Sequence, residues 1–210
     1  IIIDNSNTGN GTEHTGGLYI YNGNEVTHNI ISNNSNNTGD HSVYIDGQGI
    51  NVFTHNIING LTTGQRCEID ESITNNIFNG GVSGDFEIRD NVEVSKNHFL
   101  NSSGEAFQLE DDVNWSDNDV TQYFSKNLFS GSSSGYYLDL QDVIDGNYGI
   151  SIVQNNIINN DGFYMKAGTE NSSVENNWWG TTTESEIQDL VYDWNDDASL
   201  GFLDYDPYLT

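Results

Sequence analysis

The chain has almost no proline, cysteine or basic residues. Among its 210 residues there are one proline, one cysteine and five Lys or Arg residues. A single cysteine excludes an intrachain disulfide. Thirty-two acidic residues against those few cations give a formal net charge of -27. Because binding of nucleic acid requires Lys and Arg to neutralise phosphates, this composition argues against a nucleic-acid partner.

Long apolar runs and a recognisable leader are missing as well. No segment is long and apolar enough to predict a membrane span. The opening residues Ile1–Asp4 lack the charged region of a signal peptide, so we expect a mature form or an excised segment. The apolar fraction of 34% is low for a compact globule. A stack of repeats tolerates it, because each repeat needs only a few inward side chains.

An asparagine recurs in one frame every 20 to 30 residues. An apolar residue stands three positions before each asparagine and another stands two positions after it. This period indicates stacked repeats, in which each unit buries its apolar side against the next. Asparagine suits such a position, because its amide can bond the backbone and its own copies, and it tolerates left-handed turns. The predicted ladder is Asn29, Asn56, Asn76, Asn97, Asn127, Asn156 and Asn177.

Upstream of each asparagine stands a second apolar pair, with its members two residues apart. Leu18/Ile20, Val43/Ile45 and Phe163/Met165 are examples. This spacing is typical of a strand with one buried face. We therefore predict three short strands separated by turns in each repeat, and three parallel sheets where the repeats stack.

The arrangement resembles the right-handed parallel β-helix of the pectate-lyase-like superfamily over roughly residues 16–180. The resemblance rests on the segments His28-Asn29-Ile30-Ile31, His55-Asn56-Ile57-Ile58 and Asn155-Asn156-Ile157-Ile158. It implies an all-β, three-sheet solenoid of about seven coils. We expect these coils to occupy residues 1–180.

Residues 181–210 carry a different pattern. Thr183 followed by Glu186 is a capping box, and apolar residues then recur at helical spacing as far as Trp194. We predict an amphipathic helix over Glu184–Trp194, within a helix and capping segment that covers the last coil. Asn177-Trp178-Trp179-Gly180 and the Asp204–Leu209 segment resemble the terminal segment of many secreted β-helix proteins.

Outward positions of the first strand of each repeat should form an acidic column. Strands stack about 4.8 Å apart, so like charges at equivalent positions repel unless a cation or proton relieves them. Ca²⁺ takes carboxylate oxygens and is the candidate cofactor. The alternative is a solvated acidic surface in which Arg89 pairs with its acidic neighbours. The candidate metal ligands are Asp46, Glu68, Asp70, Glu87 and Glu110.

The same face carries candidate residues for carbohydrate chemistry. By resemblance to pectate-lyase-like enzymes, Arg89 or Lys166 would abstract the proton next to a uronate carboxylate held by Ca²⁺. No lyase signature beyond the fold is present, and the chain has five basic residues in all for an anionic substrate. Tyr19, Tyr44 and Tyr164 are candidates for stacking on sugar rings, although exposed strand tyrosines are ordinary.

The residue directly after each asparagine is mostly apolar. The set is Ile30, Ile57, Ile77, His98, Leu128, Ile157 and Trp178. Either the turn brings both neighbours of the asparagine into the core, the interpretation we favour, or these residues form an outward apolar stripe. Such a stripe would be a lateral contact surface.

These observations favour an extracellular structural or adhesive surface module. Its expected partners are a polysaccharide or copies of itself, by end-to-end or lateral assembly. The alternative is a polysaccharide lyase or glycoside hydrolase that acts on the acidic face.

Overall fold

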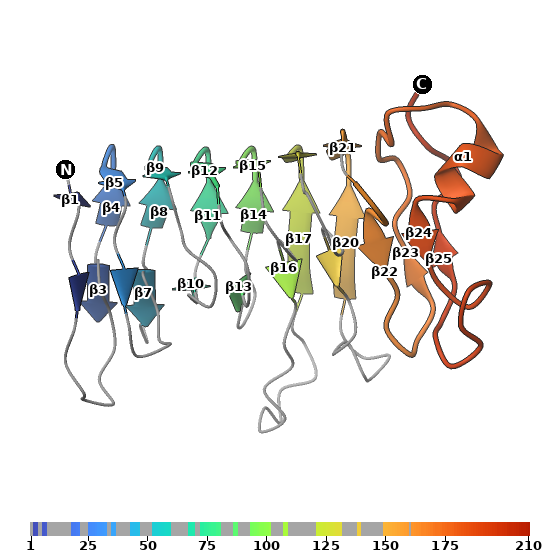
Figure 1. Cartoon of the computed structure of the whole chain (residues 1–210), viewed down its shortest axis with the longest axis horizontal. Coiled ribbons are helices and arrows are strands. Elements are labelled where there is room, and N and C mark those ends of the chain that lie inside the picture. The colour runs from blue at the N-terminus through green and yellow to red at the C-terminus, as the bar shows by residue number, and fades with distance from the viewer. Residues whose placement is uncertain are drawn as a thin grey trace.

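Short strands joined into parallel sheets make up most of the structure. The computed structural model describes residues 2–3, 6–7, 18–21, 25–32, 35–36, 43–46, 52–59, 67–69, 72–80, 86–87, 93–101, 107–108, 121–131, 138–139, 149–159 and 161–210. Successive repeats lie side by side along the long axis, with β1 at one end and α1 at the other (Figure 1). The predicted stack of parallel sheets is confirmed as a solenoid-like arrangement.

Two large sheets carry most of the described core. In both, each strand pairs in parallel with the equivalent strand of the neighbouring repeat. The seven-stranded sheet contains β1 (Ile2–Ile3), β5 (Ile30–Ser32), β9 (Ile57–Asn59), β12 (Ile77–Asn79), β15 (His98–Leu100), β18 (Leu128–Ser130) and β21 (Asn156–Ile158). The six-stranded sheet contains β4 (Glu25–Thr27), β8 (Val52–Thr54), β11 (Ile73–Thr74), β14 (Glu93–Ser95), β17 (Thr121–Ser125) and β20 (Gly149–Val153).

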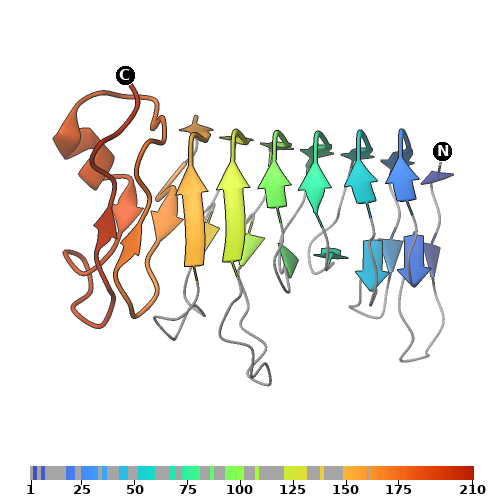
Figure 2. The same cartoon turned by 180° about the vertical axis from the view of Figure 1, so that it is seen from behind.

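The first strands of the repeats form two further sheets. One contains β3 (Leu18–Tyr21), β7 (Val43–Asp46), β10 (Cys67–Ile69) and β13 (Phe86–Glu87). The other contains β16 (Phe107–Gln108), β19 (Leu138–Asp139), β22 (Met165–Lys166) and β24 (Val191–Tyr192). Two small sheets pair β2 (Ser6–Asn7) with β6 (Ser35–Asn36), and β23 (Ser172–Ser173) with β25 (Leu203–Asp204). The rear view shows the six-stranded sheet as a row of parallel arrows (Figure 2).

In the two large sheets, the described core consists of columns of inward side chains from equivalent positions of successive strands. The middle residues of β5, β9 and β12 are buried between more exposed neighbours. Phe78, Phe99 and Phe129 stack on one another with ring centroids 4.9 and 5.1 Å apart. Burial of each phenylalanine stabilises the fold by about 1.5–3 kcal/mol, so this column links three repeats strongly.

A buried asparagine ladder runs along the turn between the six- and seven-stranded sheets. The amide group of Asn76, for example, donates to Phe53 O at 2.9 Å and to Asn97 Oδ1 at 3.1 Å. Its backbone N–H donates to the same Asn97 Oδ1 at 2.9 Å. The same contacts recur at Asn56, Asn97, Asn127, Asn155 and Asn177 where a further repeat follows. The ladder therefore satisfies backbone groups that the turn would otherwise leave buried and unpaired.

The left-handed residue of each turn is the one before the ladder asparagine. Its φ lies between 56° and 59° in all seven turns. The expectation that asparagine itself supplies the left-handed conformation is therefore wrong. In these seven turns the residues with positive φ are His28, His55, Asn75, Lys96, Lys126, Gln154 and Asn176, and outside them Asn101 and Asn159 also have φ of 56°. Since Cβ crowds the carbonyl there, each costs roughly 1 kcal/mol, which the ladder hydrogen bonds offset.

The sixth ladder position is Asn155, so the prediction of Asn156 is wrong. Asn155 is fully buried and accepts from the backbone N–H of Asn127 at 2.9 Å, whereas Asn156 is exposed. The tandem Asn155-Asn156 follows Ile152-Val153 and precedes Ile157-Ile158, so two registers fit the sequence. The pairing of β17 with β20 places Ile152 beside the buried Phe124, and that packing selects the register.

The C-terminal helix is shorter than predicted. α1 spans Glu184–Gln188, and Val191–Tyr192 form β24, which pairs with β22. β24 and β25 each extend a sheet of the preceding repeat, because the edge strands β22 and β23 offer unpaired backbone groups. Thr183 makes no side-chain cap; instead the Thr181 hydroxyl donates to the Glu186 carboxylate. No helix within the described ranges is long and apolar enough to cross a membrane.

Candidate functional site

Among the described residues, the strands of the seven-stranded sheet and the turns that precede them contain no acidic residue. Seven five-residue segments form the face that we call the acid-free face. They are 28–32, 55–59, 75–79, 96–100, 126–130, 154–158 and 176–180. Every Asp and Glu of a chain with 32 of them lies elsewhere. The register pairs these segments one above the other, so the face runs along the length of the molecule.

The left-handed residues form the rim of the acid-free face, and its charged members are Lys96 and Lys126. Both lysines are exposed, as are His28 and His55. The rings of His28 and His55 stack with centroids 5.0 Å apart and planes 3° from parallel. Among the described residues, no carboxylate forms an ion pair with Lys96 or Lys126. The rim thus concentrates positive charge in a molecule whose net charge is strongly negative.

Beside the rim runs the outward stripe that the sequence suggested as an alternative. Ile30 is 38% exposed, and Ile57, Ile77, Leu128 and Trp178 are partly exposed. The favoured interpretation, that the turn brings these residues into the core, is therefore wrong, because strand alternation holds directly after the ladder asparagine. His98 is exposed and interrupts the stripe; in the sixth repeat the outward residue is Asn156, since Ile157 belongs to the core.

A second amide ladder, which the sequence reasoning missed, borders the stripe. Asn101 donates to Asn79 Oδ1 at 2.8 Å, and Asn79 donates to Asn59 Oδ1 at 3.4 Å. Asn59 in turn donates to the Ser32 hydroxyl at 3.3 Å. The signal in the sequence is a polar residue three positions after Asn29, Asn56 and Asn76, whereas Asn101 stands four positions after Asn97. The acid-free face thus presents cations, an apolar stripe and amides in parallel columns.

The predicted acidic column lies partly within the described residues. Asp46, Glu68 and Glu87 belong to β7, β10 and β13, and the register aligns Glu68 with Glu87. Asp70, Glu110 and Arg89 lie outside the described residues. Of these three strands the structure gives the backbone register alone, so the calcium and lyase hypotheses stay predictions. Among the described residues, no three His, Cys, Asp or Glu side chains gather closely enough to hold a metal ion.

Lys166 lies two residues away from its predicted position in the column. The register aligns Met165 with Leu138 and Lys166 with Asp139. The inward pair of this repeat is Met165 and Ala167, both fully buried, and not Phe163 and Met165. Phe163 instead packs edge-on against Tyr192, with ring centroids 5.1 Å apart. The half-buried Lys166 therefore stands between the two residues of the inward pair.

The three tyrosines of the predicted sugar-stacking platform do not lie at equivalent positions. Tyr19 aligns directly with Tyr44 between β3 and β7, as expected. Tyr164 does not join them, because its side chain is only 7% exposed and packs in the core cluster. A buried ring offers no face to a sugar, so the assignment of Tyr164 to carbohydrate stacking is wrong.

Comparison with protein-family models, with curated proteins and with solved structures finds no match to this chain.

Proposed function

We propose that this chain is an extracellular structural or adhesive module that associates laterally with a second copy through its acid-free face. The observation that carries this proposal is the lack of any Asp or Glu on that face, in a chain of net charge -27. Two such molecules repel one another over most orientations. An approach through the acid-free faces minimises this repulsion, because the segments in contact then carry no Asp or Glu.

The stripe supplies an attractive contribution to the same contact. Ile30, Ile57 and Ile77 are partly exposed in adjacent repeats, and Leu128 and Trp178 continue the same column beyond the polar His98 and Asn156. Apolar residues grouped on a surface typically mark an interaction site, and each Å² removed from water contributes about 25 cal/mol. The amide column beside the stripe provides donors and acceptors for the rim of such an interface.

We also propose that the repeats wind into a single helical coil. Three strands per repeat, parallel pairing and an asparagine ladder support a right-handed parallel β-helix of the pectate-lyase-like type. A stack of this kind is extended and suits a spacer or surface module. We further propose that Ca²⁺ binds the acidic column around Glu68 and Glu87, whose aligned positions favour a bound cation.

Sedimentation velocity over a range of protein concentrations tests the lateral contact. The test variant Ile57→Glu/Ile77→Glu places two carboxylates in the stripe. The matched control Thr54→Glu/Thr74→Glu adds the same charge to the six-stranded sheet of the same two repeats. We expect wild type and control to self-associate and the stripe variant to associate roughly a hundredfold more weakly, because unpaired buried charges are costly. A wild type that stays monomeric, or equal losses in the two variants, would contradict the proposal.

A further inference from the structure

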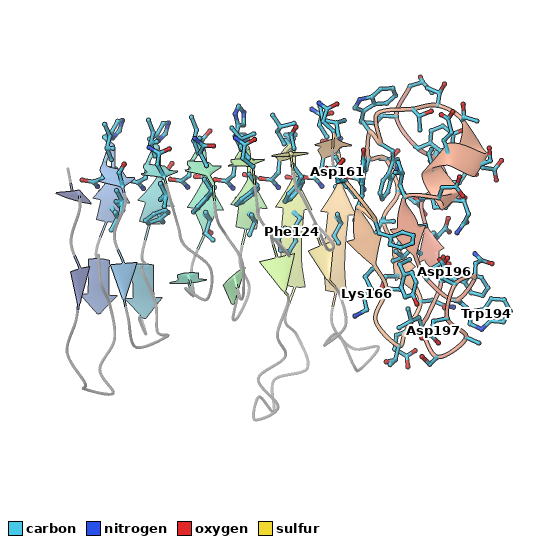
Figure 3. The ribbon with its side chains drawn as sticks, viewed as in Figure 1. Phe124, Asp161, Lys166, Trp194, Asp196 and Asp197 are labelled. Carbon is cyan, nitrogen blue, oxygen red and sulfur yellow. The ribbon has the colours of Figure 1, made fainter. Side chains whose placement is uncertain are left out.

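Two large aromatic side chains lie exposed and in contact at the C-terminal end of the molecule. Trp194 is 47% exposed and Phe202 is 43% exposed. Their ring centroids are 4.9 Å apart, with planes 32° from parallel. Figure 3 shows Trp194 at the far end of the molecule, with Asp196 and Asp197 nearby on the same loop. Since burial of such a ring would stabilise the fold by about 1.5–3 kcal/mol, their exposure calls for an explanation.

The loop that carries Trp194 is held firmly by the buried Asp193. This side chain is 1% exposed, and its Oδ1 accepts from the backbone N–H of Asn195 at 2.9 Å. Its Oδ2 accepts from the backbone N–H of Leu203 at 3.2 Å. Trp194 N donates to Gly201 O at 3.0 Å, which closes the loop at its base. The position of Trp194 is therefore fixed by hydrogen bonds to both sides of the loop.

Phe202 is fixed by contacts with the preceding repeat. Its backbone N–H donates to Asn171 Oδ1 at 2.8 Å, and Gly201 N donates to Gly168 O at 2.8 Å. A Cβ at Gly201 would lie 2.1 Å from Glu170 O, so only glycine permits this approach. Both rings thus stand on backbone that other contacts already order. Preorganisation of this kind lowers the entropic cost of binding a ligand.

Phe202 also borders a groove of about 580 Å³. The groove lies over β23 and β25, and α1 contributes Gln188 to its wall. Its lining combines hydroxyl, amide and carboxylate groups, among them Ser172, Ser173, Asn195 and Asp204. The volume falls within the range of small-ligand sites, which span about 300–1,000 Å³.

The chemistry of this site selects a ligand class. Aromatic faces pack against apolar surface and need no hydrogen bond to do so. The adjacent carboxylate and amide oxygens accept hydrogen bonds from hydroxyl groups. A sugar ring presents both kinds of surface. Four carboxylates line the groove, from Glu184, Asp193, Asp204 and Asp206, and the lining contains no Lys or Arg. An anionic sugar would therefore be repelled.

We propose that Trp194, Phe202 and the adjoining groove bind a neutral glycan chain, with sugar rings stacked on the two aromatic faces. This site lies on a different part of the surface from the acid-free face, and its occupation does not depend on self-association. It also differs from the predicted tyrosine platform, which lies on the first strands of the repeats.

Affinity electrophoresis of the purified chain through gels that contain soluble polysaccharide tests this proposal. The probes are a neutral β-glucan, a neutral galactomannan and polygalacturonate. We expect retardation by at least one neutral polymer and none by polygalacturonate. Trp194→Ala and Phe202→Ala should each weaken the retarding affinity roughly tenfold, the factor that corresponds to about 1.4 kcal/mol. Leu209→Ala is the matched control, because Leu209 is 39% exposed in the same segment and lines no part of the groove.

Further variants separate this proposal from misfolding and from the lateral contact. Trp194→Phe keeps an aromatic face and should retain most of the binding that Trp194→Ala loses. Ile57→Glu/Ile77→Glu should bind the neutral polymer as the wild type does, whatever its association state. Retardation by polygalacturonate alone, no retardation by either neutral polymer, or wild-type binding by Trp194→Ala would overturn the proposal.

Discussion

The acid-free face and the C-terminal segment both expose apolar side chains, but they do so in opposite electrostatic surroundings. The acid-free face has Lys96 and Lys126 on its rim and no carboxylate. Residues 181–210 carry no Lys or Arg and have Glu184, Glu186, Asp189, Asp193, Asp196, Asp197, Asp204 and Asp206. Charge placement, and not apolar exposure, therefore separates the partners that we propose for the two surfaces. We therefore propose an anionic second copy as the partner of the first surface and an uncharged ligand for the second.

The largest expected effect comes from breaking the ladder that aligns the acid-free face. Asn155→Ala removes the amide that bonds Phe124 O at 2.9 Å and the acceptor of Asn127 N. Both backbone groups would lose this hydrogen bond, and each buried hydrogen bond lost costs about 1–3 kcal/mol. We therefore expect a loss of about 3 kcal/mol or more in the free energy of unfolding, measured by urea denaturation.

The neighbouring Asn156→Ala is the matched control for that change. Asn156 is exposed, so its replacement should alter stability by less than about 0.5 kcal/mol. Equal losses in the two variants would contradict the ladder register. Because repeat stability is local, Asn155→Ala should also weaken lateral association more than it weakens glycan binding at the C-terminal end.

A smaller effect is expected from salt, because the two surfaces should respond differently to ionic strength. Raising the ionic strength from 0.01 to 0.15 M shortens the Debye length from about 30 to about 8 Å. The general repulsion between two molecules of charge -27 is then screened, so lateral association should strengthen severalfold. Binding of a neutral glycan involves no net charge on the ligand and should change less than about twofold. Sedimentation velocity and affinity electrophoresis at the two salt concentrations measure this. Weaker association at high salt would show that attraction between charges drives the lateral contact.

The repeat frame was predictable because its physics is local. An apolar residue three before and two after an asparagine is enough to place Phe53, Asn56 and Ile58 in the core or the ladder, and the structure agrees. The repeat frame gave a wrong prediction at the one place where the sequence fits two ladder registers equally well. The tandem Asn155-Asn156 lies between tandem apolar pairs, and only packing against Phe124 decides between them.

The exposed sites were less predictable, because they depend on elements that end or turn unexpectedly. The helical spacing of apolar residues through Trp194 predicts a helix, but Val191–Tyr192 form a strand. They do so because pairing with the open sheet edge at β22 outweighs helix propensity. Trp194 was therefore assigned to an amphipathic helix, whereas it lies exposed on a loop. Its contact with Phe202 joins residues whose proximity no periodic pattern indicates.

The smallest expected effect concerns Tyr205, which lines the C-terminal groove. Burial of the phenol raises the pKa of Tyr205 above its usual value of 10.0, and the carboxylates of Glu184 and Asp193 raise it further. Its hydroxyl donates to Gln188 Oε1 at 3.2 Å. A folded-state pKa above the unfolded value means that the neutral phenol stabilises the fold. That contribution is fully present below pH 10 and is lost as the pH rises through the folded pKa.

Urea denaturation at neutral and at alkaline pH isolates this contribution if Tyr205→Phe is compared with the wild type. The variant should be less stable at neutral pH by about 1 kcal/mol, because it lacks the hydrogen bond to Gln188. Above pH 10 the gap should narrow, since the wild type then carries a phenolate beside carboxylates and the variant does not. A stability difference that is constant with pH would contradict the acidic surroundings assigned to the groove.

The seven segments of the acid-free face contain no tyrosine, so this face has no phenol whose ionisation would lower stability at high pH. Lateral association of Tyr205→Phe should therefore match that of the wild type at neutral pH.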